Sequence, residues 1–225
     1  MHHTLAVEGQ FGFSVAMYVP LASSYDLFSA ERDRHARNVR LYSRGVFVTD
    51  DCAEVCPGWL SFLQVAVCAD DLQLHVGRSG MQHRQLLRVV ERQVLKHAVQ
   101  MLTDLRGTEA WPDFYSTYSR ELRMGVHDCE PHRESLAALC EWPTLLDPGG
   151  APVALRDHAK GGEGPLYYAT GEGSPDEVIR SPFLEALAAR GAACLLLTEP
   201  IDEYVSLRLT SFCNRQLVWA EAEPG

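Results

Sequence analysis

The first third of the chain alternates apolar and polar positions in short stretches. Positions 11, 13, 15, 17 and 19 are apolar, which is the period of a half-buried strand. Residues 39–48 predict a second strand, with Gly45 as a bulge inside it. The apolar residues 59–67 predict a helix leading into a strand, and residues 72–76 alternate again as a further strand.

The strongest periodicity in the chain is helical. Residues 81–105 place apolar side chains three or four positions apart, as in a helix with one buried stripe. Two shorter helices are predicted at residues 113–124, ended by Gly125, and at residues 133–140. The Pro- and Gly-rich residues 147–152 then predict a linker.

The last third alternates strands and helices, which is typical of a small α/β unit. Ser181 and Pro182 supply an N-cap and a first-turn proline for one helix, and Gly191 follows its predicted end. The other predicted elements are a strand at 166–170, a continuously apolar strand at 192–198, a short helix at 201–209 and a last strand at 216–220.

Composition narrows the class of protein. The 225 residues are 46% hydrophobic and 22% charged, which is ordinary for a globular protein. A net charge of -10 argues against a nucleic-acid binder, and no apolar run of about 18 residues predicts a membrane span. Seven irregularly spaced cysteines and no recognisable signal peptide predict free thiols in a reducing, cytoplasmic setting.

Self-contained catalytic signatures are weak. Gly77-Arg-Ser-Gly80 is one residue short of a nucleophile elbow, which leaves Ser79 a poor nucleophile. The stretch from His127 to His132 gathers metal-ligating residue types without a matching second cluster, so we predict no metal site. Cys52 and Cys56 have the wrong spacing for a redox pair and are interpreted as core thiols.

One arginine has an unusual setting. Arg78 follows an apolar stretch and precedes the long predicted helix, with Gly77 and Gly80 on either side. Glycines allow a loop to reach outward, and a guanidinium on such a loop can offer charge to a phosphate bound elsewhere. An ordinary surface arginine is the alternative.

A series of motifs, in order along nearly the whole chain, resembles the middle segment of the ninety-kilodalton heat-shock chaperone family. The matching stretches lie at 7–10, 25–28, 41–42, 44–50, 57–62, 71–78, 125–128, 167–172, 181–184 and 200–204. The Gly-Val-His-Asp stretch at 125–128 resembles eukaryotic more than bacterial members.

The resemblance implies an α/β architecture in three parts. We expect a larger three-layer α/β/α sandwich over residues 1–110, with an ATPase-completing loop near residues 71–82. A short helical coil would follow over residues 111–147, and a smaller α/β/α unit over residues 148–225.

The resemblance also implies a function, namely ATP-dependent maturation of client proteins by a dimeric chaperone. ATP, with Mg²⁺, would be bound mainly by a separate N-terminal domain, and dimerisation would lie further C-terminal. Arg78 would reach the terminal phosphate, Gln82 would lie on the same loop, and Phe47 would help to position it. The implied surface for clients and cochaperones comprises Tyr25, Leu27 and Phe28.

The loop departs from the family pattern at several positions. Gln73 replaces a proline, His75 an asparagine, Gly77 a serine and Ser79 a glutamate, while Cys68 replaces an upstream aspartate. The chain is therefore interpreted as a diverged paralogue, and an isolated segment is not expected to hydrolyse ATP. The alternative is a scaffold or client-binding module of a degenerate chaperone without efficient hydrolysis.

Overall fold

The computed structural model shows a mixed α/β chain, as the sequence predicts. It describes residues 1–8, 12–19, 38–50, 52, 54–70, 80–161, 164–171 and 173–220, with the backbone alone at 80–83. Contacts divide the chain into two units, Met1–Tyr118 and Ser119–Gly225. The predicted three-part division at residues 110 and 147 stays a prediction, and the predicted strand at 72–76 lies outside the described residues.

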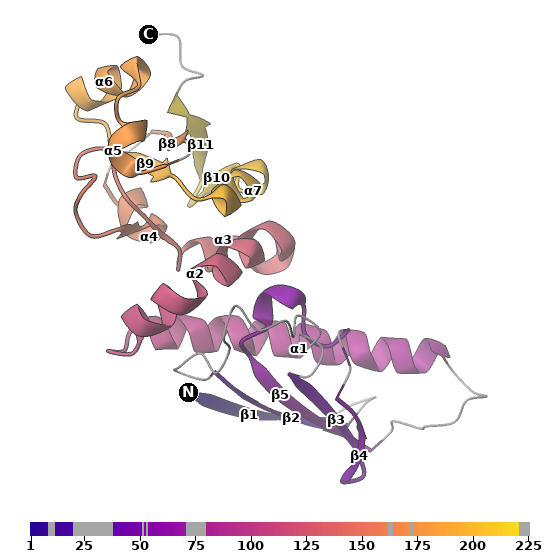
Figure 1. The fold of residues 1–225 in the computed structure, drawn as a ribbon. Coiled ribbons are helices and arrows are strands. Elements are labelled where there is room, and N and C mark those ends of the chain that lie inside the picture. The colour runs from indigo at the N-terminus through magenta and orange to yellow at the C-terminus, as the bar shows by residue number, and fades with distance from the viewer. Residues whose placement is uncertain are drawn as a thin grey trace. The chain divides into compact units, whose positions relative to one another are not determined.

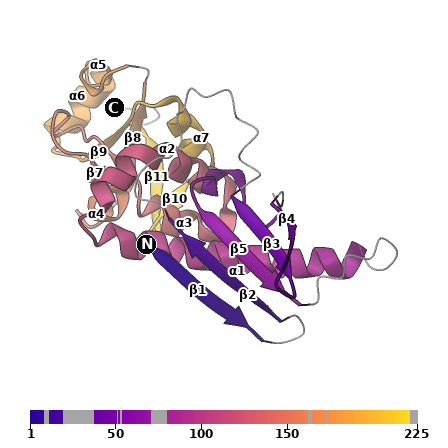
Figure 2. The same cartoon turned by 60° about the horizontal axis from the view of Figure 1, so that its bottom comes forward.

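A five-stranded sheet organises the first unit, in the order β1-β2-β5-β3-β4. Its strands are β1 (His2–Val7), β2 (Phe13–Tyr18), β3 (Val39–Ser43), β4 (Val46–Thr49) and β5 (Gln64–Ala69). β3 and β5 are parallel, and the other neighbours are antiparallel. Helix α1 (Gly80–Arg106) runs along one face of the sheet (Figures 1 and 2).

The predicted periodicities of β2 and α1 are confirmed. On β2 the side chains of Phe13, Val15 and Met17 are buried and alternate with exposed ones. The stripe of α1 is buried at eight of its nine predicted positions, and Leu95 is half-buried. Burial of these two facing surfaces forms the core of the first unit.

Residues 39–48 form a hairpin rather than the single strand predicted. Arg44 (φ 49°) and Gly45 (φ 78°) make a two-residue turn between β3 and β4. Positive φ at both central residues matches the twist of a tight hairpin, and glycine adopts it without strain. The irregularity in this pair lies instead between Leu41 and Tyr42, where the register shifts.

A buried amide fixes the turn that leads into β5. The side chain of Asn38 donates to the carbonyl oxygens of Leu63 (2.8 Å) and Leu60 (3.3 Å). The backbone carbonyl oxygen of Asn38 accepts from the backbone N–H of Val65 at 2.7 Å. The predicted helix before this strand is a single 3-10 turn, η2 (Gly58–Leu60).

Helix α2 (Trp111–Asp128) bends at Tyr118, whose φ of −121° and ψ of 17° are not helical. The hydroxyls of Ser116 and Thr117 donate to the carbonyl oxygen of Asp113 at 2.9 and 3.0 Å. Such side-chain bonds compete with the backbone ladder and bend helices. The bend falls where the two units divide.

The C-terminal end of α2 also differs from the prediction. Gly125 is buried inside the helix and does not end it. The helix ends three residues later, at Asp128, and Arg133 satisfies its last turn by donating to the carbonyl oxygens of Val126 (2.9 Å) and His127 (3.2 Å). A cation at this end also interacts favourably with the helix dipole.

The second unit contains a four-stranded sheet, in the order β10-β11-β8-β9, with α5 and α6 on one side and α7 on the other (Figures 1 and 2). Neighbours β11, β8 and β9 are parallel. The elements are η3 (Glu130–His132), α3 (Arg133–Ala137), β6 (Glu141–Trp142), β7 (Val153–Ala154), α4 (Leu155–Ala159), β8 (Leu166–Thr170), α5 (Pro175–Val178), α6 (Pro182–Ala189), β9 (Cys194–Leu197), α7 (Pro200–Arg208), β10 (Ser211–Phe212) and β11 (Arg215–Trp219).

The order of elements predicted for this unit is confirmed, but the predicted linker is wrong. β9 is buried at every position, as its continuous apolar run indicates. Residues 147–152 lie between β6 and β7, which pair with each other in an antiparallel ladder. The stretch is therefore the loop of a local hairpin within the second unit.

None of the helices in the described part of the chain combines the length and hydrophobicity that a membrane span requires.

Candidate functional site

Residues 71–79, which contain the predicted phosphate-reaching Arg78, connect strand β5 to helix α1. β5 ends at Ala69 and α1 begins at Gly80. Arg78 and Ser79 lie outside the described residues, as do Tyr25, Leu27 and Phe28. Gln82 is in the first turn of α1, where only its backbone is described.

The start of α1 has the electrostatic character of an anion-facing helix end. Its first turn carries no acidic side chain, so no carboxylate opposes the partial positive charge there. The chain reaches this helix only two residues after Arg78. Both features favour negative charge near this end of α1.

Strand pairing places three side chains in one row across the sheet. Cys68 of β5 pairs with Tyr42 of β3, and Tyr42 pairs with Phe47 of β4. Residues that pair directly across strands lie on the same face of a sheet. Their chain neighbours Val67 and Leu41 are buried on the face that α1 covers, so this row lies on the opposite face. Because Cys68 lies near the carboxyl end of β5, this row is at the end of the sheet from which residues 71–79 depart.

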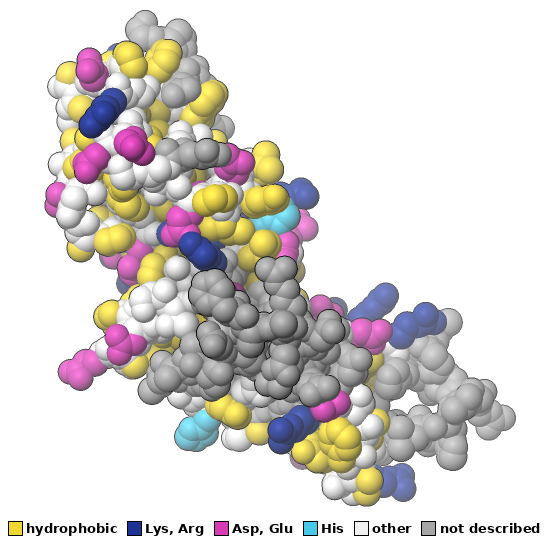
Figure 3. All heavy atoms as spheres, viewed as in Figure 1, with side chains coloured by type: hydrophobic (Ala, Val, Ile, Leu, Met, Phe, Trp, Pro, Cys, Tyr) yellow, Lys and Arg dark blue, Asp and Glu magenta, His cyan; other side chains and the backbone are white. Residues whose placement is uncertain are grey.

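Phe47, predicted to position that segment, is exposed on an edge strand. Its side chain is 52% exposed and that of its neighbour Val46 66%. The rings of Tyr42 and Phe47 meet edge to face, with centroids 5.9 Å apart and an interplanar angle of 73°. Hydrophobic side chains gather on the surface at this hairpin (Figure 3). The sequence singled out Phe47 but not the ring that contacts it.

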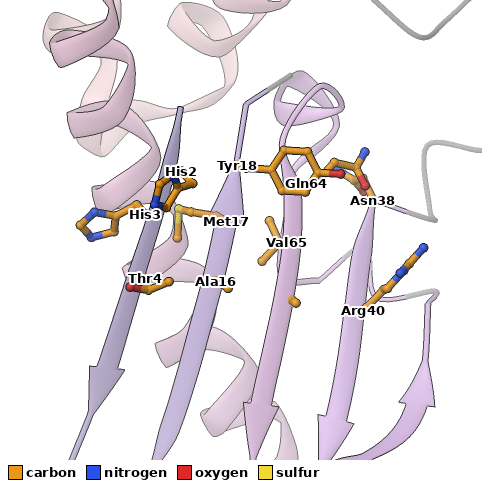
Figure 4. Close-up of a pocket in the computed structure, with 11 residues that line it drawn as sticks. His2, His3, Thr4, Ala16, Met17, Tyr18, Asn38, Arg40, Gln64 and Val65 are labelled. Atoms are coloured by element: carbon orange, nitrogen blue, oxygen red, sulfur yellow. The ribbon is translucent and has the colours of Figure 1, made fainter. Parts of the chain in front are cut away.

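A shallow groove of about 310 Å³ crosses the same sheet at its opposite end. The residues that line it include those at the beginnings of β3 and β5. Figure 4 shows Tyr18 of β2 reaching toward Gln64 of β5, while Arg40 points away. The sequence did not predict this groove. The groove lies where β5 begins, at the end of the sheet opposite to the one at which β5 leads into residues 71–79.

The competing catalytic candidates gain no support from the described residues. His127 Nδ1 lies 2.7 Å from Asp128 Oδ1, and no group of three or more metal-ligating side chains gathers anywhere in the described ranges. All seven cysteines are free thiols. Burial raises the pKa of Cys56 and of Cys194 to about 12, which leaves both as inert core thiols.

The acidic balance belongs mostly to the second unit. The sequence of the first unit contains 11 Lys and Arg residues and 13 Asp and Glu residues. The second unit contains 9 Lys and Arg residues and 17 Asp and Glu residues. Figure 3 shows acidic side chains spread over the second unit. The unit that carries Arg78 is therefore nearly neutral, which suits an approach to a polyanion.

A buried charge cluster, not predicted from the sequence, lies within the second unit. Arg123 of α2 lies 2.8 Å from Glu199 and 3.4 Å from Asp202, at the start of α7. Its guanidinium also donates to the carbonyl oxygen of Glu141 at 3.0 Å. The cluster joins α2 to α7 and β6 and is structural in character, because Arg123 and Asp202 are buried and Glu199 is only partly exposed.

The two carboxylates of this cluster respond differently to the same arginine. Burial raises the pKa of Asp202 even though Arg123 and Trp142 favour its charged form. For Glu199, burial opposes ionisation, but Arg123 and Arg120 outweigh it and the pKa is lowered. The half-exposed Glu199 is thus the main counter-ion of Arg123.

Comparison with known proteins matches this fold and order of motifs to one family. The family model described as Hsp90 protein matches residues 1–224. The chain is 35% identical to the endoplasmin homolog of Caenorhabditis elegans over 90% of its own length and 27% of the relative. It is 31% identical to heat shock protein 83 of Leishmania donovani, over 94% of the chain and 47% of that relative. It is 36% identical to the chaperone protein HtpG of Streptomyces coelicolor, over 88% of the chain and 31% of that relative.

The solved structures agree on the fold. The middle domain of a Plasmodium falciparum heat shock protein has a TM-score of 0.83 at 24% identity, covering 99% of this chain and 88% of that one. The structure is thus a chaperone middle-domain fold. The chain belongs to the Hsp90 family, as the motif series predicts, and spans less than half the length of these curated relatives. The relatives are eukaryotic and bacterial alike, so the eukaryotic character of residues 125–128 stays a prediction.

Proposed function

We propose that this chain is the middle segment of an ATP-dependent chaperone and supplies Arg78 to the γ-phosphate of ATP held by an N-terminal domain. The guanidinium would stabilise negative charge on the phosphoryl group during hydrolysis. Mg²⁺ and most nucleotide contacts belong to that other domain, and Gln82 would assist from the first turn of α1.

The observation that carries this proposal is the arrangement at one end of the first sheet. Residues 71–79 depart from β5 beside the row formed by Cys68, Tyr42 and Phe47, and they return to the start of α1. The described ends of this connection are thus a strand that pairs into the row with the exposed Phe47 and a helix start without acidic side chains. This setting suits an arginine that acts on a ligand bound outside the chain.

The remaining parts of the proposal concern partners. Tyr25, Leu27 and Phe28 would form an apolar surface for client proteins and cochaperones. The complete protein would work as a cytoplasmic homodimer, with its nucleotide and dimerisation sites on domains before and after this segment. Membership of the Hsp90 family supports these expectations in general terms.

The test is ATP turnover by the full-length protein carrying the Arg78→Ala substitution. We expect a loss of more than tenfold, because one guanidinium on a transferring phosphoryl group commonly contributes that much or more. The matched control is Arg92→Ala, which removes an exposed arginine of α1 and should leave turnover unchanged. Equal turnover in the wild type and Arg78→Ala would refute the arginine assignment.

The degenerate-scaffold alternative makes a different prediction for the same protein. Wild-type protein would bind and protect an unfolded client without measurable ATP hydrolysis, even with a cochaperone activator present. The glycines at 77 and 80 favour this reading, since they raise the cost of ordering the segment.

A further inference from the structure

We infer that helix α2 is a hinge, with its pivot at Tyr118 and Ser119, about which the two units change orientation while each keeps its own core. This device goes beyond the proposed function, because it involves neither ATP nor the Arg78 segment.

The backbone of α2 leaves the helical conformation at Tyr118. This residue has a φ of −121° and a ψ of 17°, with helix before and after it. Sharp bends in helices usually have a proline or a glycine as their cause. No proline or glycine lies within four residues of Tyr118. The bend therefore has another cause.

Two neighbouring hydroxyls supply that cause. Ser116 and Thr117 donate to the same acceptor, the carbonyl oxygen of Asp113, at 2.9 and 3.0 Å. In an unbroken helix this oxygen accepts from the backbone N–H of Thr117 alone. One bond of the same kind, from the Thr103 hydroxyl to the carbonyl oxygen of Val99 (2.8 Å), leaves α1 helical. Two such bonds at one carbonyl weaken the backbone ladder just where α2 bends.

Side chains on the two sides of the bend are held by different units. The buried ring of Tyr118 packs against Phe62 and Phe114, with centroids 4.9 and 5.1 Å away. After the bend, Arg123 pairs with Glu199 of the second unit at 2.8 Å. Each half of α2 is thus fixed to its own unit. Hinges absorb a rotation in the φ and ψ of a few residues, and the residues between these two anchors are the ones available for it.

The hinge has two states. With both hydroxyl bonds made, α2 is bent, as in the structure. With both broken, the backbone ladder closes through Tyr118 and α2 runs straight. The side chains of Ser116 and Thr117 are exposed, so each hydroxyl exchanges its bond to Asp113 for one to water at little net cost. The two states therefore interconvert on the microsecond-to-millisecond timescale of hinge motions.

A first experiment measures the opening of α2 directly. Hydrogen exchange of the full-length protein is followed by mass spectrometry in overlapping peptides that cover the helix. We expect the amides of residues 118–122 to exchange at least about tenfold faster than those of residues 123–127, because the open hinge exposes them to water. Ser116→Ala combined with Thr117→Ala should restore slow exchange, since both hydroxyl donors are gone and alanine favours the helix. Uniformly slow exchange along α2 in the wild type would overturn the inference.

The chain offers a matched control for this double variant. The hydroxyls of Thr103 in α1 and Ser206 in α7 donate to carbonyl oxygens four and three residues back, at 2.8 Å each. Thr103→Ala combined with Ser206→Ala therefore removes the same two kinds of bond away from the bend. We expect it to leave the exchange of α2 unchanged. Equal effects of the two double variants would show that the hydroxyls before Tyr118 have no special role, against the inference.

A second experiment measures the orientation of the two units. Spin labels on p-acetylphenylalanine replace Arg92 of α1 and Arg190 at the end of α6, both exposed. Labelled chains are mixed with an excess of unlabelled protein, so that the distances measured by double electron–electron resonance lie within one chain. We expect a broad or double distribution in the wild type and a single narrower one in Ser116→Ala with Thr117→Ala, because only the straight form remains. A wild-type distribution as narrow as that of the double variant would mean that the bend is static, and the hinge would be rejected.

Discussion

Trp142 donates its indole N–H to Asp202 Oδ1 at 2.8 Å, across 60 residues of sequence, and both side chains are buried. Arg123 lies over the same indole ring, 5.5 Å from its centroid, and within 3.4 Å of the same carboxylate. The carboxylate therefore has a neutral donor and a cation in the interior. These contacts explain how β6, α2 and the start of α7 are held together.

Loss of the buried cation should be costly. In Arg123→Met the buried Asp202 loses its cation and Glu199 keeps only the exposed Arg120, so we expect a loss of about 3–5 kcal/mol in the free energy of unfolding. The matched control is Arg120→Met, one turn away on α2 and paired with the same Glu199 at 3.0 Å, with a side chain 77% exposed. That variant should cost less than about 1 kcal/mol in a urea titration. Similar costs for the two variants would contradict the buried role of Arg123.

The indole donor can be removed by putting a smaller aromatic ring in its place. Trp142→Phe leaves Asp202 Oδ1 without the indole N–H and leaves part of a buried site unfilled, so we expect a loss of about 2–4 kcal/mol. Trp219→Phe is the control, because Trp219 is 41% exposed on β11. Thermal unfolding followed by circular dichroism would separate the two variants. No difference between them would show that the Trp142 hydrogen bond is dispensable.

The aromatic cluster of the first unit should depend on Phe114. Its side chain is fully buried and packs against the rings of Phe62, Trp111 and Tyr118. We expect Phe114→Ala to cost about 3–5 kcal/mol through lost burial and the cavity it leaves. The same change at Phe183, which is 51% exposed on α6, should stay within about 0.5 kcal/mol. Chemical denaturation of both variants is the measurement, and a tolerated Phe114→Ala would argue against this core.

The edge strand β1 should loosen in mild acid. Its His3 ring stacks on His97 of α1, with centroids 4.7 Å apart, and burial, His3 and Lys96 lower the pKa of His97. The unfolded chain, where this pKa returns to about 6.5, then binds more protons in that range than the folded chain. The stability contributed by neutral His97 is thus complete above pH 6.5 and is lost as the pH falls through the lowered pKa. Melting temperatures from pH 5 to 7.5 should fall less steeply in His97→Gln, and identical slopes would contradict the assignment.

Thiol reactivity should single out one cysteine. Cys213 is exposed in the turn between β10 and β11, Cys68 is half-buried, and the other five cysteines are buried. We expect a disulfide reagent at pH 8 to modify Cys213 rapidly in the native protein and all seven thiols after denaturation. Mass spectrometry of digested protein identifies the modified residue, and Cys213→Ser should abolish the fast phase. Rapid modification of Cys56 or Cys194 would contradict their burial.

Periodicity predicted those elements whose inward side chains are strongly apolar. The stripe of α1 and the continuous run of β9 are examples, since each buries nearly every apolar position. β1 was not predicted, because its inward side chains include His3 and are only half-buried. Gly45 was predicted as a bulge within one strand because tight hairpin turns usually carry an asparagine or aspartate before the glycine, and here that residue is Arg44.

The candidate site was predictable only in part. The motif series singled out Arg78 and Phe47 from local sequence, and family membership is confirmed. The row of Cys68, Tyr42 and Phe47 depends on pairing between β3, β4 and β5, and on a register shift that no local pattern encodes. The same holds for Arg123 and Asp202, because charges that meet in the interior carry no periodic signal along the chain.

The bend of α2 at Tyr118 has a practical consequence for dissecting the chain. Trp111 and Phe114, before the bend, complete the aromatic cluster of the first unit, whereas Arg123, after it, completes the charge cluster of the second. Separate expression of the two halves should therefore divide the gene after codon 118. Division after codon 110, the boundary suggested by the sequence, would remove a fully buried phenylalanine from one fragment and attach it to the other as an exposed, aggregation-prone end.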